Sequence, residues 1–393
     1  ESLKFYFINL NPENLLHHPK DPAEGVFSFF LTGDALYSLH DPETVRIWEI
    51  ILSLPAVRII CDRQELALRG ITIEGLKMKF YDQVIDHNRL GVNGQQSFWN
   101  DVVKVARQHE QPIPSTIGYL QLESPYMYRS SLSAVRCLAA ALDVHASVDL
   151  YAYLDGIHLG HSDQNPVDAD TTGKELEEIR EKAAKRGLQC RMLACNRCAT
   201  ARGYSTWDAG AGLVVSASMI RPFRIRNLNE MIEQFGRNHI ILGENVASIR
   251  QKKEAPSSLP SGEKGRAPPL TILVTSTPYA TERMFGAVSL AVATAAGGIP
   301  TRVIFIEDGV YILAGTQQTE QDTQMFNIQE VIDVVAGSDD LQFFAFQPSL
   351  HRRGITKNPK MKAVLDIGMP ELGQLLFSPQ NETRAGHQRI IFF

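Results

Sequence analysis

The chain has 393 residues and a formal net charge of −5, and 44% of its residues are hydrophobic while 21% are charged. This length exceeds what one ordinary core needs, so two or three domains are expected, and the composition is typical of globular proteins. The slightly acidic charge disfavours direct nucleic-acid binding, and five cysteines, an odd number, do not suit the disulfide framework of a secreted protein. Without a basic leader or an apolar stretch long enough to span a bilayer, we expect a cytoplasmic protein with reduced thiols and no membrane contact.

Residues 1–112 have the weakest pattern of the chain. The apolar run Ile59-Ile60-Cys61 indicates a buried strand. A helix opened by Ser97 is predicted with one apolar face, formed by Phe98, Val102 and Val105. Residues 13–25 hold prolines and histidines in place of a clear long helix, and a short Pro-bearing joint at 111–115 ends this part.

Residues 113–250 alternate between strand and helix patterns. The predicted strands are 119–122, 148–154, 188–194, 213–217 and 239–242, and the predicted helices are 129–142, 172–186 and 228–235. Thr172 and Glu175 have the spacing of a capping box, while Gly187 and Gly236 are placed to end helices.

Residues 251–268 form a flexible linker by composition, rich in Pro, Ser, Gly, Lys and Glu. Beyond it, residues 269–393 repeat the alternation, with strands predicted at 271–275, 302–307, 341–346 and 389–393 and a helix at 283–296. Alternating elements of this kind build an α/β fold, in which a mostly parallel sheet is covered by helices on both faces.

Three landmarks recur in the same order along the chain. A polar residue followed by proline comes first (Asn11-Pro12, Ser124-Pro125, Thr277-Pro278), then an Asp with a small residue (Asp34-Ala35, Asp155-Gly156, Asp308-Gly309), then an Arg-Gly pair (Arg69-Gly70, Arg202-Gly203, Arg353-Gly354). From Pro to Asp is 30 residues in both later copies, and from Asp to the Gly is 48 and 46 residues. The sequence therefore predicts three repeated modules, at 1–112, 113–250 and 269–393.

The second module carries a Cys-x-x-Cys pair, Cys195 and Cys198, directly after an apolar strand. A helix that started after Cys195 would favour its thiolate through the free amide groups of the first turn. Arg197 and Arg202 add positive charge nearby, and Cys198, one turn on, is close enough to form or resolve a disulfide. This is the pattern of an exposed, activated thiolate that attacks or accepts sulfur.

Loops beyond the carboxyl ends of parallel strands collect at one edge of a sheet. Ser124, Asp155 and His158 follow strands of the same module as Cys195, so we expect all four on one rim. There they are candidates for binding a substrate or partner.

Other interpretations of the cysteines stay open at this point. A Cys-x-x-Cys pair can be metal-binding or merely redox-sensitive, and Cys190, Cys195 and Cys198 have the spacing of an iron–sulfur site. No cysteine follows as a fourth ligand, so we expect no bound metal. Cys137 and Cys190 are expected to be core residues, and Cys61 is a secondary thiol candidate because we expect it at the strand end equivalent to Cys195.

Remaining features are weaker. Arg221, Arg224 and Arg226 form a basic strip that could dock an acidic carrier protein or could simply be solvated. The Asp and Arg-Gly landmarks could be turn formers alone. No phosphate-binding glycine motif follows a strand, and we expect no cofactor.

These residues resemble the DsrE/DsrF/DsrH family of sulfur-relay proteins, also known as TusD, TusC and TusB. The second module resembles the DsrE type through the run from Cys195 to Gly203, the third the DsrF type through residues 305–311 and 349–354, and the first the DsrH type through residues 33–37 and 68–70. The resemblance implies a flavodoxin-like three-layer fold for each module. It also implies that Cys195 carries a persulfide, whereas Phe346 takes the equivalent place in the third module.

Members of the family assemble as three-fold rings that often stack in pairs. The resemblance therefore implies a pseudo-trimer within one chain, two chains forming a homodimer, and a small sulfur-carrier protein (TusA-like, or TusE/DsrC-like) as donor or acceptor. The leading hypothesis is a sulfurtransferase that relays sulfane sulfur in sulfur metabolism or tRNA thiolation. A non-catalytic scaffold or sulfur sensor of the same fold and a thiol–disulfide oxidoreductase remain as alternatives.

Overall fold

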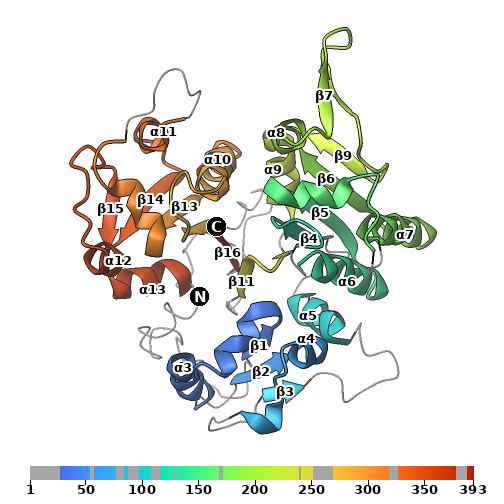
Figure 1. Cartoon of the computed structure of the whole chain (residues 1–393), viewed down its shortest axis with the longest axis horizontal. Coiled ribbons are helices and arrows are strands. Elements are labelled where there is room, and N and C mark those ends of the chain that lie inside the picture. The colour runs from blue at the N-terminus through green and yellow to red at the C-terminus, as the bar shows by residue number, and fades with distance from the viewer. Residues whose placement is uncertain are drawn as a thin grey trace, which may run out of the picture.

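The computed structural model describes residues 27–53, 57–76, 84–86, 97–107, 116–127, 130–167, 171–238, 240–250, 269–317, 326–377 and 387–393. These residues form three α/β lobes, which Figure 1 shows arranged around the C-terminus of the chain. We call them the first lobe (β1 to α5), the second lobe (β4 to β10) and the third lobe (β11 to β16). In the described ranges no helix is long and apolar enough to cross a membrane.

The second lobe has a sheet of five parallel strands in the order β10-β4-β5-β6-β9. These strands are β4 (Thr116–Gln121), β5 (Ser147–Ala152), β6 (Cys190–Cys195), β9 (Phe223–Arg226) and β10 (Ile240–Leu242). The helices are α6 (Ser130–Asp143), the 3-10 helix η5 (Leu154–Gly160), α7 (Thr172–Lys185), α8 (Asn196–Ala201) and α9 (Leu228–Arg237). A separate antiparallel hairpin, β7 (Ser205–Asp208) with β8 (Leu213–Ser216), projects from this lobe (Figure 1).

The third lobe repeats this order. Its parallel strands are β12 (Leu270–Val274), β13 (Thr301–Phe305), β14 (Leu341–Phe346), β15 (Val364–Ile367) and β16 (His387–Phe392), in the order β16-β12-β13-β14-β15. At the edge, β11 (Val246–Arg250) runs antiparallel to β16. The helices are α10 (Arg283–Ala296), η6 (Glu307–Leu313), α11 (Ile328–Val335), α12 (Gln347–Arg352) and α13 (Met369–Phe377).

The first lobe is the smallest in its described part. Its three parallel strands are β1 (Phe27–Leu31), β2 (Val57–Cys61) and β3 (Val84–Asp86). The helices are η1 (Gly33–Leu39), α3 (Pro42–Leu52), α4 (Arg63–Leu68), η2 (Ile73–Gly75) and α5 (Ser97–Arg107). Leu36, Leu39 and Ile59 are fully buried in a core of its own, whereas the second and third lobes share most of one larger core.

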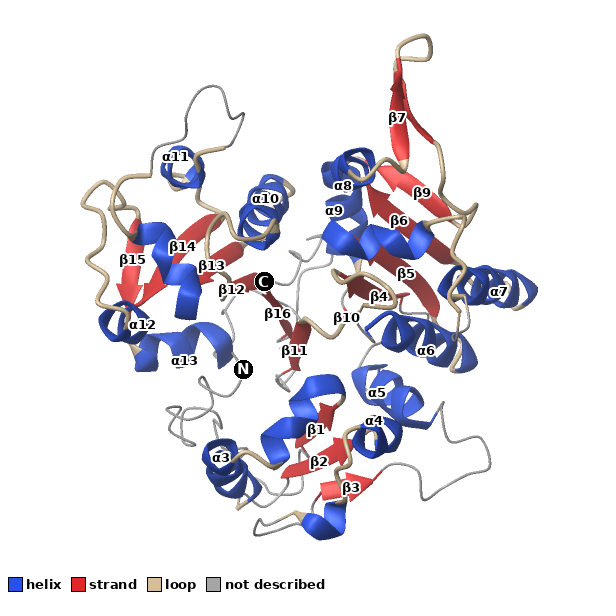
Figure 2. Cartoon of the chain, viewed as in Figure 1, coloured by secondary structure: helices blue, strands red, loops and turns tan. Residues whose placement is uncertain are grey.

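The predicted fold class, mixed α/β with mostly parallel sheets flanked by helices, is confirmed, and Figure 2 shows the alternation along each lobe. The predicted ranges of α10 and β14 agree with the structure at both ends, because each has an unbroken apolar pattern.

Several boundaries differ from the predictions. Thr172 is the first helical residue of α7 rather than its cap, and the N-cap Thr171 makes no side-chain hydrogen bond to the helix, so the predicted capping box is wrong. Gly236 lies within α9, which continues to Arg237. The predicted strand at 213–217 belongs to the β7–β8 hairpin instead of the parallel sheet.

The apolar face predicted for residues 97–107 is displaced by one position. Phe98 and Val103 are buried, while Val102 and Val105 are only half-buried. Trp99 explains the shift, because it is also buried and packs edge-on against Tyr119 of the second lobe. The face of α5 is thus set by its contact with the next lobe.

A seven-residue 3-10 helix follows one strand in every lobe: η1, η5 and η6. Each begins with a left-handed residue, namely Gly33, Leu154 or Glu307, with φ of 58°, 50° and 50°. Two residues on, a Cβ at Gly156 or Gly309 would lie 2.1 or 2.0 Å from a carbonyl oxygen of the neighbouring strand's end, Gln121 or Val274. These glycines therefore let the turn pack directly on the sheet.

The Pro-Tyr landmark forms the same contacts in the second and third lobes. Tyr126 and Tyr279 are both left-handed, with φ of 67° and 62°, and each hydroxyl donates a 2.8 Å hydrogen bond to a glutamine 38 residues later, Gln164 or Gln317. Each hydroxyl also accepts a hydrogen bond from the first residue of the following helix, Thr172 or Ile328. The sequence repeat therefore reflects a repeated three-dimensional structure.

Neighbouring lobes contact each other through corresponding helices. The last helix of the first lobe, α5, packs on α6, the first long helix of the second lobe, and α9 of the second lobe packs on α10 of the third in the same way. Gly297, just beyond α10, touches Ile232 of α9. In both cases the last helix of one lobe thus packs on the first long helix of the next.

Candidate functional site

The thiols lie where β6 ends and α8 begins. Cys195 is the last residue of the strand and the N-cap of the helix, and α8 starts at Asn196, so the condition set for a favoured thiolate is met. The helix is only six residues long because Gly203 then adopts a left-handed φ of 77°, and Tyr204 N–H returns to Ala199 O. This turn fixes the position of Arg202 beside the strand ends.

Cys195 is held as a thiolate. Its side chain makes no hydrogen bond that caps the helix. The S–H of Cys198 and the backbone N–H groups of Cys198 and Arg197 nevertheless favour its negative charge. Together they outweigh the opposing effect of burial and lower the pKa of Cys195 to about 6.

Cys198 is the partner whose thiol form is favoured. Its hydrogen bond to Cys195 and its burial raise its pKa above the usual range, although the N–H of Leu154 points at its sulfur. The two thiols therefore titrate as one coupled pair, in which the negative charge is favoured on Cys195.

The thiolate is not exposed, in contrast to the expectation from the sequence. Cys195 is 1% exposed and Cys198 is 7% exposed. An open depression lies on α8, the helix that follows Cys195, and is lined by Asn196, Arg197, Thr200 and Ala201. Reaction at Cys195 thus needs either a local movement or an approach from this side.

The other three cysteines are also free thiols. Burial raises the pKa of Cys137 above the usual range and that of Cys190 to about 12. Cys61 is fully buried at the end of β2, one residue before Asp62, the N-cap of α4. Asp62 lies eight residues before Gly70, as Cys195 lies eight before Gly203, so the structure puts Asp62 rather than Cys61 in the position of Cys195.

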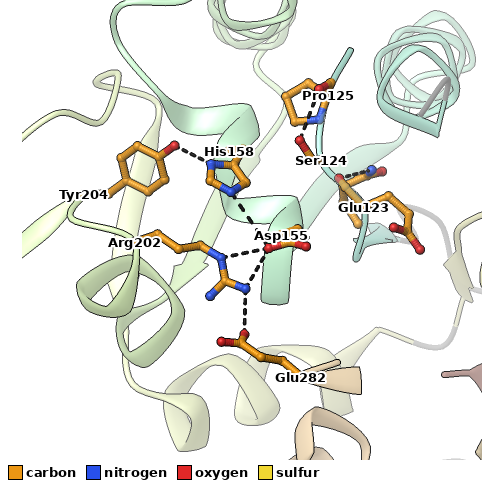
Figure 3. Close-up of polar contacts among 9 residues, drawn as sticks. Glu123, Ser124, Pro125, Asp155, His158, Arg202, Tyr204 and Glu282 are labelled. Carbon is orange, nitrogen blue, oxygen red and sulfur yellow. Dashed lines mark hydrogen bonds and ion pairs between the residues drawn. The ribbon is translucent and has the colours of Figure 1, made fainter. Parts of the chain in front are cut away.

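Arg202 joins the predicted rim residues to another lobe. Its guanidinium forms an ion pair of 2.7 Å with Asp155 and one of 2.6 Å with Glu282, which caps α10 of the third lobe (Figure 3). His158 lies on the other side of Asp155, 3.8 Å away, and is hydrogen-bonded to the Tyr204 hydroxyl (Figure 3). Partial burial lowers the pKa of His158, which favours the neutral ring.

The Asp–Arg pair occurs in all three lobes. Arg69 contacts Asp34 at 2.8 Å, and Arg353 contacts Asp308 at 2.7 Å, as Arg202 contacts Asp155. These residues are the second and third sequence landmarks, brought together because they follow neighbouring parallel strands. A pair that also occurs without thiols is first of all a structural feature of the fold.

Two predicted residues lie apart from this network. The Ser124 hydroxyl donates to Pro125 O within the loop after β4, as Figure 3 shows. Arg197 is exposed, and its guanidinium stacks over the Phe285 ring of α10 at 5.0 Å.

Sequence reasoning missed the residues that approach the thiols from the strand end and from the third lobe. Burial raises the pKa of Tyr153, the nearby thiol pair adds to this effect, and its hydroxyl donates to Gly286 O of α10 at 3.0 Å. Glu282, Phe285 and Gly286 carry no motif that links them to Cys195, and no signal within the second module could have found them.

Among the described residues, no group of three or more His, Cys, Asp or Glu side chains is arranged to hold a metal ion. Cys195 and Cys198 are free thiols that are hydrogen-bonded to each other, so the site has the chemistry of a thiol pair.

The DsrE/DsrF-like family matches residues 269–378 of the chain, which lie in the third lobe. Among solved structures, the crystal structure of the ychN protein from E. coli is similar at 20% identity, over 32% of this chain and 99% of that one, with a TM-score of 0.27. No curated protein matches the chain. The predicted family resemblance is thus confirmed for the third lobe, while the thiol pair lies outside the matched residues.

Proposed function

We propose that this protein relays sulfane sulfur, with Cys195 as the residue that carries it. The observation that supports this most directly is the thiolate of Cys195, with a pKa of about 6, at the start of a helix and bonded to a second thiol. A match of the third lobe to the DsrE/DsrF-like family, which is generally linked to sulfur relay, supports the same reaction class.

The chemistry needs no outside oxidant. The Cys195 thiolate attacks the outer sulfur of a donor persulfide, R–S–SH, forming a new S–S bond while the donor's own S–S bond breaks and R–S⁻ leaves. An acceptor thiolate then attacks the outer sulfur of Cys195–S–SH, and Cys195 leaves as the thiolate. Its low pKa makes it a good leaving group in this second step, and the amide groups of α8 favour the negative charge in both states.

We assign the donor and acceptor roles to small sulfur-carrier proteins, and Arg197, two residues after Cys195, is an exposed cation that such a partner could contact. Asp155, His158 and Arg202 then shape the rim against which the partner binds, and Ser124 lines the loop next to it.

We further propose that the three lobes are modules of DsrH-, DsrE- and DsrF-like type arranged as a pseudo-trimer. The repeated helix contacts, α5 with α6 and α9 with α10, support a head-to-tail order in which each module presents the same face to the next. We expect two chains to stack as a homodimer. Light scattering that gives the mass of one chain would remove the dimer but leave the pseudo-trimer.

The relay is tested by intact-protein mass after exposure of the full chain to inorganic polysulfide. We expect a reductant-sensitive gain of one sulfur atom, absent in Cys195→Ser and kept in Cys190→Ser, the matched control with a high-pKa thiol. An equal gain in Cys195→Ser would contradict the proposal.

The hydrogen bond between Cys195 and Cys198 supports a second candidate, thiol–disulfide exchange through an internal disulfide. In that case the same experiment gives the loss of two hydrogens in place of an added sulfur. A protein that shows neither change is a scaffold or sensor.

A further inference from the structure

Residues of another lobe pack beside the thiol pair. Cys195 is 1% exposed, yet either proposed reaction requires a sulfur atom of the donor to reach it. The donor reaches it either along the depression on α8 or after a local movement, and the contacts around the thiols identify the part whose movement would open the site.

Four contacts around the thiols lead to the first turn of α10. Arg202 pairs with Glu282 at 2.6 Å, Arg197 stacks over Phe285, and the Tyr153 hydroxyl donates to Gly286 O, as described above. Arg283 forms an ion pair with Glu123, at the end of β4. Residues 282–286 thus contact β4, the end of β5 and α8 together, and we call them the α10 cover.

Gly286 packs closely on Leu154 of the second lobe. A Cβ at this position would lie 2.9 Å from Leu154 Cδ2 and 3.0 Å from Leu154 Cδ1, so a larger residue requires either the Leu154 side chain or α10 to shift. Leu154 is also the residue whose N–H points at the sulfur of Cys198. The backbone of α10 is therefore packed against the same residue that supports the thiol pair.

We propose that the α10 cover completes the thiol site and determines access to Cys195, so that the third lobe acts on chemistry carried by the second. This rests on the proposed role of Cys195 as the reacting thiol. Glu282 and Arg283 are then positioning residues: they hold the cover in place through charges on the second lobe and do not themselves meet the sulfur.

The two ion pairs of the cover differ in burial. Glu282 is 61% exposed in its pair with Arg202, and exposed pairs contribute little to stability. Glu123 is only 13% exposed in its pair with Arg283, so this pair holds the cover more firmly. Opening at this edge thus requires the Arg283–Glu123 pair and the Tyr153–Gly286 hydrogen bond to part, while the β-sheets stay intact.

A charge-reversal cycle at Arg283 and Glu123 tests the cover, because this ion pair spans the two lobes and neither residue favours or disfavours the thiolate directly. Labelling of Cys195 by iodoacetamide is timed in the full chain for Arg283→Glu, Glu123→Arg and the double variant. We expect each single variant to label roughly three- to tenfold faster, since an attraction becomes a repulsion, and the double variant to return to within about twofold of the unaltered protein.

The pH profile separates opening from a change in the thiol itself. In all variants the midpoint of labelling should stay near that of the unaltered protein while the plateau rate changes. Glu233→Arg, which reverses one charge of an exposed ion pair on α9, is the matched control and should leave both unchanged. A single variant that shifts the midpoint without raising the plateau contradicts the inference.

A steric variant gives an independent test. Gly286→Ala should raise the labelling rate by forcing Leu154 or α10 to shift, whereas Gly173→Ala, at a helical glycine with ordinary contacts, should not. If the charge variants and Gly286→Ala all label at the unaltered rate, α8 opens without the third lobe and the inference is wrong. Persulfide formation on Cys195 would still be detected by mass in that case, so the proposed function is judged separately.

Discussion

The second and third lobes build the same strand end in two chemical versions. In both, a buried strand runs into a six-residue helix, an arginine pairs with the aspartate of a neighbouring turn, and a left-handed glycine ends the helix. Cys195 and Cys198 of the second lobe correspond to Phe346 and Ser349 of the third. The fold of this element is therefore independent of the thiols.

The third lobe lacks the reactive thiol, and it also lacks one of the amide groups that would favour a negative charge at that position. Position 348, which corresponds to Arg197, is a proline, so one of the amide groups that favour the Cys195 thiolate has no counterpart. Ser349 makes the same structural contact as Cys198. Its hydroxyl oxygen accepts a hydrogen bond from Glu307 N–H, as the sulfur of Cys198 accepts one from Leu154 N–H. In the first lobe Asp62 takes the N-cap place and accepts from Gln64 N–H.

The sharpest test of this comparison is removal of the proton donor. In Cys198→Ala the Cys195 thiolate loses its strongest favourable contact, so its pKa should rise from about 6 toward the usual value. At pH 7 the thiolate fraction would then fall roughly tenfold or more, and iodoacetamide labelling should slow accordingly. Cys198→Ser keeps a donor and should slow labelling less. Equal rates in the two variants would mean that α8 alone sets the pKa.

The coupled thiol pair also makes stability depend on pH. The folded pKa of Cys195 is lowered, so its contribution is present above the unfolded thiol pKa and is lost as the pH falls toward about 6. Between roughly pH 8.5 and 6 the free energy of unfolding should therefore fall relative to Cys195→Ser, by at most ~1.4 kcal/mol per pH unit. Urea unfolding of both proteins across this range measures the difference. A difference that is flat with pH would show that Cys195 is protonated in the folded protein.

Because the two strand ends have the same backbone structure, replacing Gly203 or Gly354 by alanine should lower the free energy of unfolding by the same amount. Both have positive φ, 77° and 61°, and a Cβ at either would meet no atom within 4 Å, so alanine adds only backbone strain. Each Gly→Ala variant should lose about 1–2 kcal/mol of stability. Gly337 also has open space but no positive φ, so Gly337→Ala should cost nothing. Unequal losses at Gly203 and Gly354, measured by thermal unfolding, would mean that the thiols strain the second lobe.

The smallest effects are expected at the Asp–Arg pairs. Asp155 and Asp308 are 54% and 52% exposed in their pairs, so Asp155→Asn and Asp308→Asn should each cost less than ~1 kcal/mol. Cys195 labelling should change, by no more than about twofold, in Asp155→Asn alone, because Arg202 also holds Glu282 of the α10 cover. A larger loss in Asp308→Asn would overturn the view that these pairs are equivalent.

The sequence predicted best those features that are formed by residues of a single module. The meeting of Asp155 with Arg202, 47 residues apart, could be predicted because parallel strands bring their carboxyl ends to one edge. The short outer strands β9 and β15 were missed, since charged residues such as Arg224 and Asp366 interrupt their apolar patterns.

Two kinds of feature could not be predicted from the sequence. One depends on contacts with other lobes, and the other depends on aligning two modules to within one residue. The hydrogen bond from Tyr153, beside the thiols, to Gly286 of α10 joins residues that lie 133 apart in the chain. Cys61 was compared with Cys195 by its place in an apolar run, but the count back from the Arg-Gly pair puts Asp62 there. A shift of one residue along a strand turns a side chain to the opposite face, so such comparisons need the helix cap as their reference.

The edge strand β11 links parts of the chain that the sequence assigns to different modules. It follows β10 of the second lobe, yet its partner is β16, at the end of the third. From β16 the buried Arg389 donates to the carbonyl oxygens of Phe235 and Asn238 in the second lobe. If the chain were cut between residues 250 and 269, the two fragments would thus still recognise each other through a strand ladder and a buried cation. We expect separately produced fragments 1–250 and 269–393 to reassemble by complementation, and fragment 269–393 to do so poorly if it ends before β16.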